Sequence, residues 1–274
     1  MRAFRGLPLL AVMPLLTACA PALREPPPLA ALGGSAARAP VETPAAADVD
    51  RVLGEAEAGF ARRPDGPAVT RALELFLAAA RADDTRVEGL LGAARTAAWL
   101  VEHEPSGARR AALATEAVQA CQWCLRRAPT NIDCKYRLAL ALGQQARERR
   151  STSADALPRI VSLLEEVIAE APHLDEAGGH RVLGLVLLRA PGWPTGPGDP
   201  EAGLEHARAA DALVPDNPGN LLVLGEALAA TGSARQARVA YQRAERLARA
   251  RAAGGDPDAG EQADAAARAL KALR

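Results

Sequence analysis

Three prolines set a period of 43 residues along this chain of 274 residues. Pro129, Pro172 and Pro215 each follow an apolar segment that has the pattern of a helix end. Because proline cannot continue a helix, prolines at one fixed spacing mark the same corner in successive units. A period of this length indicates a repeat array, in which each unit buries its apolar face against its neighbours.

The last unit of the array shows the pattern most clearly. Its first helix carries Leu224 and Gly225, and its second helix carries Ala237 and Tyr241. This order of large and small residues resembles the tetratricopeptide repeat. The small residues let two antiparallel helices approach closely, while Leu224 and Tyr241 fill the groove between units. We therefore predict an all-α fold, a tetratricopeptide-like array of helix pairs.

We expect about five helix pairs followed by a C-terminal capping helix at 258–273. The pairs are predicted at residues 50–82, 86–127, 131–170, 175–213 and 218–250. No segment of useful length alternates apolar and polar residues at period two, so no sheet is predicted. A generic helical bundle is the alternative, and the proline period argues against it.

The start of the chain has the composition of a secretory signal. A basic beginning precedes an apolar run at residues 7–16, which is too short to span a bilayer. Residues 16–19, LTAC, resemble the bacterial lipobox, and the resemblance implies cleavage before Cys19 and lipidation of that cysteine. An ordinary secretory signal with an incidental cysteine is the alternative. We predict a lipoprotein signal peptide at 1–18, and Ala20 favours the periplasmic face of the outer membrane over the inner membrane.

A segment rich in proline and alanine follows at residues 19–47. It holds few large apolar side chains, so it cannot bury enough surface to offset the entropy that ordering would cost. We expect this segment to be a disordered tether. The repeat domain is then predicted to occupy residues 48–274.

The sequence holds no motif that predicts catalysis, a cofactor or a metal. The 33 basic and 33 acidic residues balance, which gives no sign of a nucleic-acid partner. The four histidines are scattered, and no two of them are three or four residues apart. We expect no catalytic, cofactor-binding or metal-binding residues and no enzyme, with a hydrolase whose site is not visible in the sequence as the alternative.

Three cysteines follow Cys19. Cys121 and Cys124 have the spacing of a redox or metal pair, but they lie in mid-helix with no preceding strand and no suitably spaced histidine. Cys124 lies near the end of one helix and Cys134 near the start of the next, so antiparallel packing would bring them level. We expect a Cys124–Cys134 disulfide, with Cys121–Cys134 or three buried thiols as the alternatives.

Residues 183–194, LGLVLLRAPGWP, end a helix and enter a loop that closes at 198–200, GDP. Together with the lipobox and the helical array, this order is similar to the T-component family of TRAP transporters, which are periplasmic lipoproteins of tetratricopeptide-like helix pairs. The similarity spans most of the mature chain, and the loop is its distinctive part. It implies a role beside the substrate-binding protein of a transporter for small organic acids or other hydrophobic ligands.

Trp193 in this loop has two interpretations. It could contact a partner or a ligand, since tryptophan is favoured at binding hot spots. Alternatively it packs under its own loop and holds the loop against the array, which is the interpretation we favour.

Together these features indicate a non-catalytic, lipid-anchored periplasmic adaptor that binds a partner protein or an apolar small ligand. The similarity to the T-component family implies an accessory role for a TRAP-type organic-acid transporter. The alternative is an envelope-complex assembly factor or a pilotin-like scaffold lipoprotein.

Overall fold

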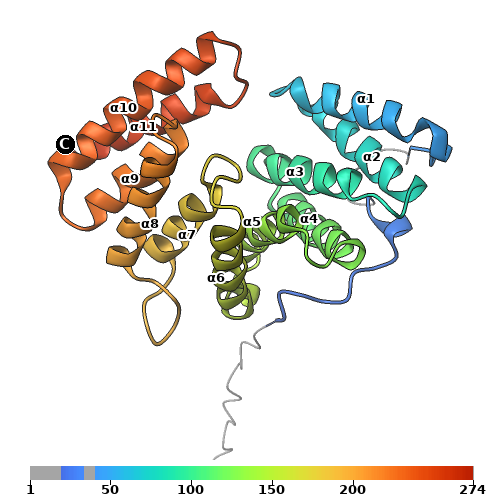
Figure 1. Ribbon diagram of the computed structural model, residues 1–274, viewed down its shortest axis with the longest axis horizontal. Helices are drawn as coiled ribbons and strands as arrows, with labels where there is room; N and C mark the ends of the chain where they lie inside the picture. The colour runs from blue at the N-terminus through green and yellow to red at the C-terminus, as the bar shows by residue number, and fades with distance from the viewer. Residues whose placement is uncertain (1–19, 34–40, 274) are drawn as a thin grey trace, which may run out of the picture.

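The computed structural model describes residues 20–33 and 41–273. These residues form eleven α-helices, three short 3-10 helices and no named strand, and they fold as five helix pairs and a last helix (Figure 1). The predicted all-α helix-pair array is therefore confirmed. The helices are α1 Val49–Ala61, α2 Gly66–Ala82, α3 Glu88–His103, α4 Gly107–Arg127, α5 Ile132–Glu148, α6 Ser153–Glu170, α7 Gly178–Arg189, α8 Pro200–Leu213, α9 Pro218–Ala230, α10 Ala234–Ala253 and α11 Ala259–Ala272.

The prolines of the 43-residue period lie at the corners between units. Pro129, Pro172 and Pro215 each stand two residues past the end of α4, α6 and α8. Two of the following helices, α5 and α9, begin at a polar cap: the side chains of Asn131 and Asn217 accept hydrogen bonds from backbone N–H groups of the first turn. The corners are therefore set by residues close to them in the sequence. For that reason the helix limits could be predicted from the sequence.

Close helix packing depends on small residues at the predicted positions. A Cβ atom added to Gly225 would lie 2.5 Å from Cε1 of Tyr241, and Ala237 is completely buried. A larger side chain at either position would collide with its neighbour. The same arrangement recurs near the start of the array, where Gly92 lies against the ring of Phe76.

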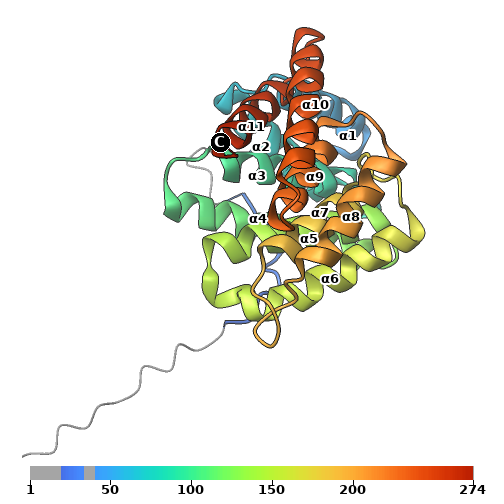
Figure 2. The same cartoon turned by 90° about the vertical axis from the view of Figure 1, so that its left-hand side faces the viewer.

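The array curves until its two ends meet. The turn before α11 approaches the end of α1 at the top of both views (Figures 1 and 2). Arg63 donates to both carboxylate oxygens of Asp258, at 2.9 and 3.1 Å, and His103 lies 2.6 Å from Glu261. We call these two pairs the closure contact. They join residues 195 and 158 positions apart in the sequence.

The N-terminal segment, residues 20–33, lies along the outside of α4 and α6. Gln122 and Trp123 donate to the carbonyls of Arg24 and Pro27, at 2.8 and 3.0 Å, and Ala22 is 3% exposed. This differs from the disordered tether that the composition predicts. Polar side chains of α4 satisfy the backbone of this segment, so it docks without needing many large apolar residues. Residues 34–40 lie outside the described part of the chain.

The predicted signal peptide and Cys19 also lie outside the described residues. Within the described residues, none of the helices combines the length and the apolar character that crossing a membrane requires.

Candidate binding surfaces

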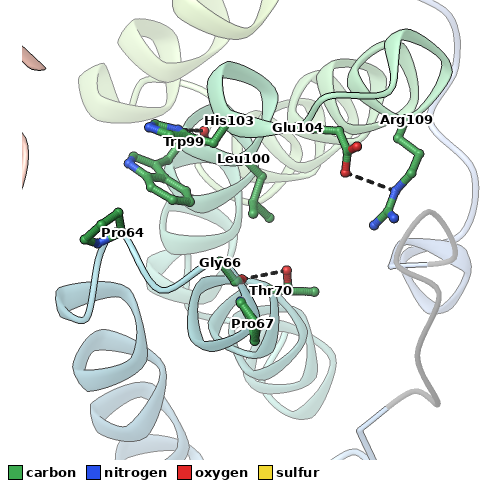
Figure 3. A pocket seen from close by; sticks show the side chains of 9 residues that line it. All are labelled: Pro64, Gly66, Pro67, Thr70, Trp99, Leu100, His103, Glu104 and Arg109. Carbon is green, nitrogen blue, oxygen red and sulfur yellow. Dashed lines mark hydrogen bonds and ion pairs between the residues drawn. The ribbon is translucent and has the colours of Figure 1, made fainter.

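A pocket of about 540 Å³ lies beside the closure contact (Figure 3). We call it the closure pocket. It lies among the start of α2, the end of α3 and the start of α4. Its lining residues are Pro64, Gly66, Pro67, Thr70, Trp99, Leu100, His103, Glu104 and Arg109.

The polar side chains of the closure pocket are bonded to one another or to the backbone. Nε of Arg109 lies 3.1 Å from Glu104, and the Thr70 hydroxyl donates to the Gly66 carbonyl at 2.9 Å (Figure 3). The polar side chains that would have to bind or activate a substrate are therefore engaged in bonds within the protein. The arrangement stabilises the end of the array and offers no nucleophile paired with a base.

His103 joins the pocket to the last helix. Its ring stacks on Trp99 at 3.7 Å between centroids, Nδ1 lies 2.8 Å from the Trp99 carbonyl, and Nε2 lies 2.6 Å from Glu261. Burial lowers the pKa of His103, but the Trp99 carbonyl and the Glu261 carboxylate outweigh burial and raise the pKa above its ordinary value of 6.5. The protonated ring satisfies both acceptors, so it is the form that favours closure.

Helix α10 presents a basic and partly apolar surface. It carries six arginines and one glutamate, and Val239 on its outer side is 54% exposed. Beneath Val239 lies a groove of about 270 Å³ against α9, lined by Leu221, Leu224 and Leu228. Arg235 and Arg246 are exposed and have no ion-pair partner among residues 20–33 and 41–273. We call this surface the α10 face.

Trp193 lies in the loop between α7 and α8 and is 90% exposed. The favoured interpretation, in which Trp193 packs beneath its own loop, is therefore wrong. The loop closes on its own backbone, because Gly198 donates to the Pro191 carbonyl at 2.8 Å and a Cβ atom at Gly198 would collide with that carbonyl. A contact between Trp193 and a partner or ligand stays a prediction.

The cysteines lie where α4 and α5 meet. A disulfide joins Cys124 and Cys134, whose Cα atoms are 5.7 Å apart, while Cys121 is free and buried. Burial raises the pKa of the Cys121 thiol to about 12, so this thiol is protonated and unreactive at neutral pH. Within the described residues, no three His, Cys, Asp or Glu side chains gather as a metal site would require.

Two histidines that are scattered in the sequence meet in the structure. Nδ1 of His180 on α7 lies 2.9 Å from Nδ1 of His206 on α8. Burial lowers the pKa of both rings, and the charge of His206 lowers that of His180 further. Gly184 and Gly203 let the two helices approach closely enough for this contact. These glycines are the only signal in the sequence, and they do not give the register of the two helices.

Comparison with known proteins supports the fold alone. No protein-family profile and no curated protein sequence matches the chain. The solved structures that are similar include TTC0263, a thermophilic TPR protein of Thermus thermophilus, and MamA from Desulfovibrio magneticus RS-1. The fold is a tetratricopeptide-like array.

The similarity to these two structures covers most of the array. The TTC0263 structure is 20% identical, covers 80% of this chain and 98% of its own, and has a TM-score of 0.58. The MamA structure is 19% identical, covers 74% of this chain and 96% of its own, and has a TM-score of 0.50. At these identities the tetratricopeptide-like array carries over to this chain, whereas partners and ligands do not. No family profile matches this chain, and that includes any profile of the T-component family.

Proposed function

We propose that this chain is a non-catalytic adaptor, anchored by lipid at Cys19 to the periplasmic face of a bacterial outer membrane. It binds a partner protein through the α10 face. The observation that carries the proposal is the pairing of unpartnered arginines with an apolar groove on one exposed helix.

The chemistry of the α10 face defines the segment that it binds. Arg235 and Arg246 favour carboxylates, and the groove beneath Val239 favours aliphatic side chains. An acidic amphipathic helix supplies both, with apolar residues at i, i+3 and i+4 spacing in the groove. The shallow groove, which Val239 and arginines border, fits such a helix better than it fits a small apolar ligand.

The resemblance of residues 183–200 to the T-component family supports one kind of partner. On that ground the chain is an accessory of a TRAP-type organic-acid transporter, and its partner is the transporter's substrate-binding protein. The second candidate is an assembly or pilotin-like scaffold lipoprotein of an envelope complex. Both use the α10 face as a protein-binding surface, so the identity of the partner separates them.

Recovery of the partner from cells tests the proposal. Tagged full-length protein is solubilised from the envelope in mild detergent, and the proteins that co-purify are identified by mass spectrometry. We expect Arg235→Glu with Arg246→Glu to lower recovery of the main partner at least about tenfold, since like charges then face its acidic residues. Arg208→Glu with Arg268→Glu is the matched control, because both arginines are exposed and neither has an ion-pair partner in the part of the chain that the structure describes.

Equal recovery with both double variants would overturn the α10 face as the binding surface. A solute-binding protein among the partners supports the transport role, and subunits of an envelope complex support the scaffold role.

The anchor has its own test: we expect Cys19→Ala to move the protein from the membrane fraction to the soluble periplasm. A mutant that still sediments with membranes contradicts lipid anchoring.

A further inference from the structure

Ala20 and Ala22 are bonded to the start of α6. The backbone N–H of Ala20 donates to the Ser151 carbonyl at 2.9 Å, and that of Ala22 donates to the Asp155 carboxylate at 2.9 Å. Ser151 lies in the 3-10 turn Arg150–Thr152 that leads into α6. The start of the N-terminal segment is therefore held against the start of α6.

The loop that carries Trp193 projects to the same side of the molecule. In Figures 1 and 2 the loop between α7 and α8 and the start of the N-terminal segment both lie at the bottom of the body, whereas α10 lies at the top. Trp193 is 90% exposed, and backbone bonds such as that from Asp199 to the Leu187 carbonyl, at 2.9 Å, hold its loop. An exposed indole has an apolar body and a polar N–H, a combination that favours the interface between a membrane and water.

Unpaired positive charge surrounds the start of the N-terminal segment. Arg24 and Arg149 line a cavity of about 320 Å³ together with Ala20, and Arg150 follows directly in the chain. All three arginines are exposed, and none forms an ion pair with any residue of 20–33 or 41–273.

The carboxylates nearby are already neutralised. Asp155 pairs with Arg159 and accepts from the backbone of Ala22. Glu148 pairs with Arg110 and Arg147. The free charge beside Ala20 is therefore positive, whereas the exposed carboxylates Asp199 and Glu201 lie after the Trp193 loop, at the start of α8.

We propose that this side of the molecule, which we call the membrane face, lies against an anionic phospholipid bilayer. It consists of Ala20, Arg24, Arg149, Arg150 and Trp193. The arginines bind phosphate groups of the lipids, and the indole of Trp193 enters the headgroup region. The proposal rests on lipidation of Cys19, the residue that precedes Ala20 in the sequence.

The membrane face adds a second attachment to the acyl chains and fixes the orientation of the body. An acyl anchor combined with basic residues binds anionic membranes more firmly than either signal alone. Because the N-terminal segment is docked, the domain is not suspended on a free tether. The α10 face then points away from the bilayer and stays open to a partner.

Fluorescence quenching in vesicles tests this orientation. Full-length lipidated protein is reconstituted into phosphatidylethanolamine–phosphatidylglycerol vesicles that contain headgroup spin-labelled lipid. An environment-sensitive dye is attached at Ser151→Cys, at Thr195→Cys or at Gln242→Cys, which lie beside Ala20, in the Trp193 loop and on α10. The native cysteines do not compete, because Cys121 is buried and Cys124 is bonded to Cys134. Cys19 carries the lipid, and it is changed to serine in any protein that lacks the acyl chains.

We expect quenching at positions 151 and 195 to be at least about threefold stronger than at 242. Arg149→Gln with Arg150→Gln should lower quenching at 151, and Trp193→Ala should lower it at 195. Replacing phosphatidylglycerol by phosphatidylcholine should lower quenching at 151, as the arginine substitutions do. Arg208→Gln with Arg268→Gln is the control that should change neither signal.

Equal quenching at the three positions would overturn the membrane face. So would quenching that stays the same when the arginines or Trp193 are replaced, or when the anionic lipid is removed. A protein that cross-links to position 195 while lipid quenching is absent there would also overturn it, in favour of a protein partner at Trp193. Mass spectrometry of the purified chain tests the anchor separately. If acyl chains are absent, an N-terminal histidine tag on a nickel-chelating lipid replaces them, and the same comparison still decides the orientation.

Discussion

Helices α1–α6 and helices α8–α11 differ in the kind of core that holds them. The first group has one large core with bulky buried side chains, among them Phe76, Tyr136 and Ile160, and a small cluster around the disulfide. The second group has two small clusters, in which six of the eleven buried residues are alanines. The disulfide and the docked N-terminal segment also belong to the first group. Less apolar surface is buried per helix in the second group, so we expect it to open at a lower free energy.

The two groups are joined by polar contacts. In the turn before α7, Asp175 accepts from the Tyr136 hydroxyl and from Arg181, both at 2.6 Å. Glu176 beside it bonds Asn217 and, at 3.3 Å, Arg251. The closure contact is polar as well. Apolar side chains of α7 also pack against both groups, with Leu183 in the core of the first and Leu188 against that of the second. Because the polar contacts are added to this packing, salt and pH should act on the joint more than on either core.

Removal of the disulfide should give the largest effect and should act on the first group alone. The bond closes a short loop, with a sequence separation of 10. We expect Cys124→Ala with Cys134→Ala to lower the free energy of unfolding by about 2–3 kcal/mol. Hydrogen exchange should speed up in α4 and α5 and stay unchanged in α9 and α10. Alkylation of Cys121, Cys124 and Cys134 together in the denatured, non-reduced protein would contradict the disulfide.

Overpacking at Gly225 should destabilise the second group. Any side chain at this position collides with the Tyr241 ring. We expect Gly225→Leu to cost about 1–3 kcal/mol, with α9 and α10 unfolding first in a denaturant titration. Ala237→Leu should act in the same way, because Ala237 is completely buried.

The control for overpacking is Gly143→Ala in α5. A Cβ atom there meets nothing within 4 Å, so we expect stabilisation by about 0.4–1 kcal/mol. An unchanged midpoint in both Gly225→Leu and Ala237→Leu would show that the alignment of the last unit is wrong.

Breaking the closure contact should separate the ends of the array at a small cost in stability. Arg63 is mostly buried, but Asp258 is about half exposed, so we expect Asp258→Asn to cost about 0.2–1 kcal/mol. Small-angle X-ray scattering should show a larger radius of gyration for this variant. Arg62→Gln, at an exposed neighbouring ion pair, is the control that should leave the radius unchanged.

The pH dependence of closure follows from His103. Its pKa is raised in the folded protein, so its contribution is complete below the ordinary value of 6.5 and is lost as pH rises through the folded value. The radius of gyration should therefore grow at alkaline pH. A radius that does not change with pH, or that changes equally in His103→Gln, would contradict this role.

The pair His180–His206 should give the smallest effect, with the opposite sign. Both pKa values are lowered, so the stabilising contribution is complete above 6.5 and is lost as pH falls through the folded values. The denaturation midpoint of α7 and α8 should fall between pH 7 and pH 5. His206→Gln should flatten this dependence, and an identical pH profile in the variant would contradict it.

The sequence predicts the helix pairs well because their limits are local. Pro129, Pro172 and Pro215 end units, and residues such as Asn131 begin helices whatever the rest of the chain does. The level positions of Cys124 and Cys134 follow from the corner between two antiparallel helices in the same local way.

Features that depend on contacts between distant elements could not be predicted from the sequence. The meeting of His180 and His206 depends on the register of α7 and α8, to a fraction of a helical turn. The docking of residues 20–33 depends on side chains of α4 and α6 about a hundred positions away. The exposure of Trp193 depends on a loop whose backbone closes on itself, with Gly198 donating to the Pro191 carbonyl. In each case the sequence gives the residue types, but the distances between residues far apart in the chain depend on the folded structure.

The meeting of the two ends restricts how a gene for this array can change in length. An open repeat array can gain or lose a unit at modest cost, because each unit contacts only its neighbours. Here an added helix pair would carry α11 away from α1 and α3, leaving Arg63 and His103 without their carboxylates. A lost pair would drive the ends into each other. Relatives that keep the closure contact should therefore keep five pairs.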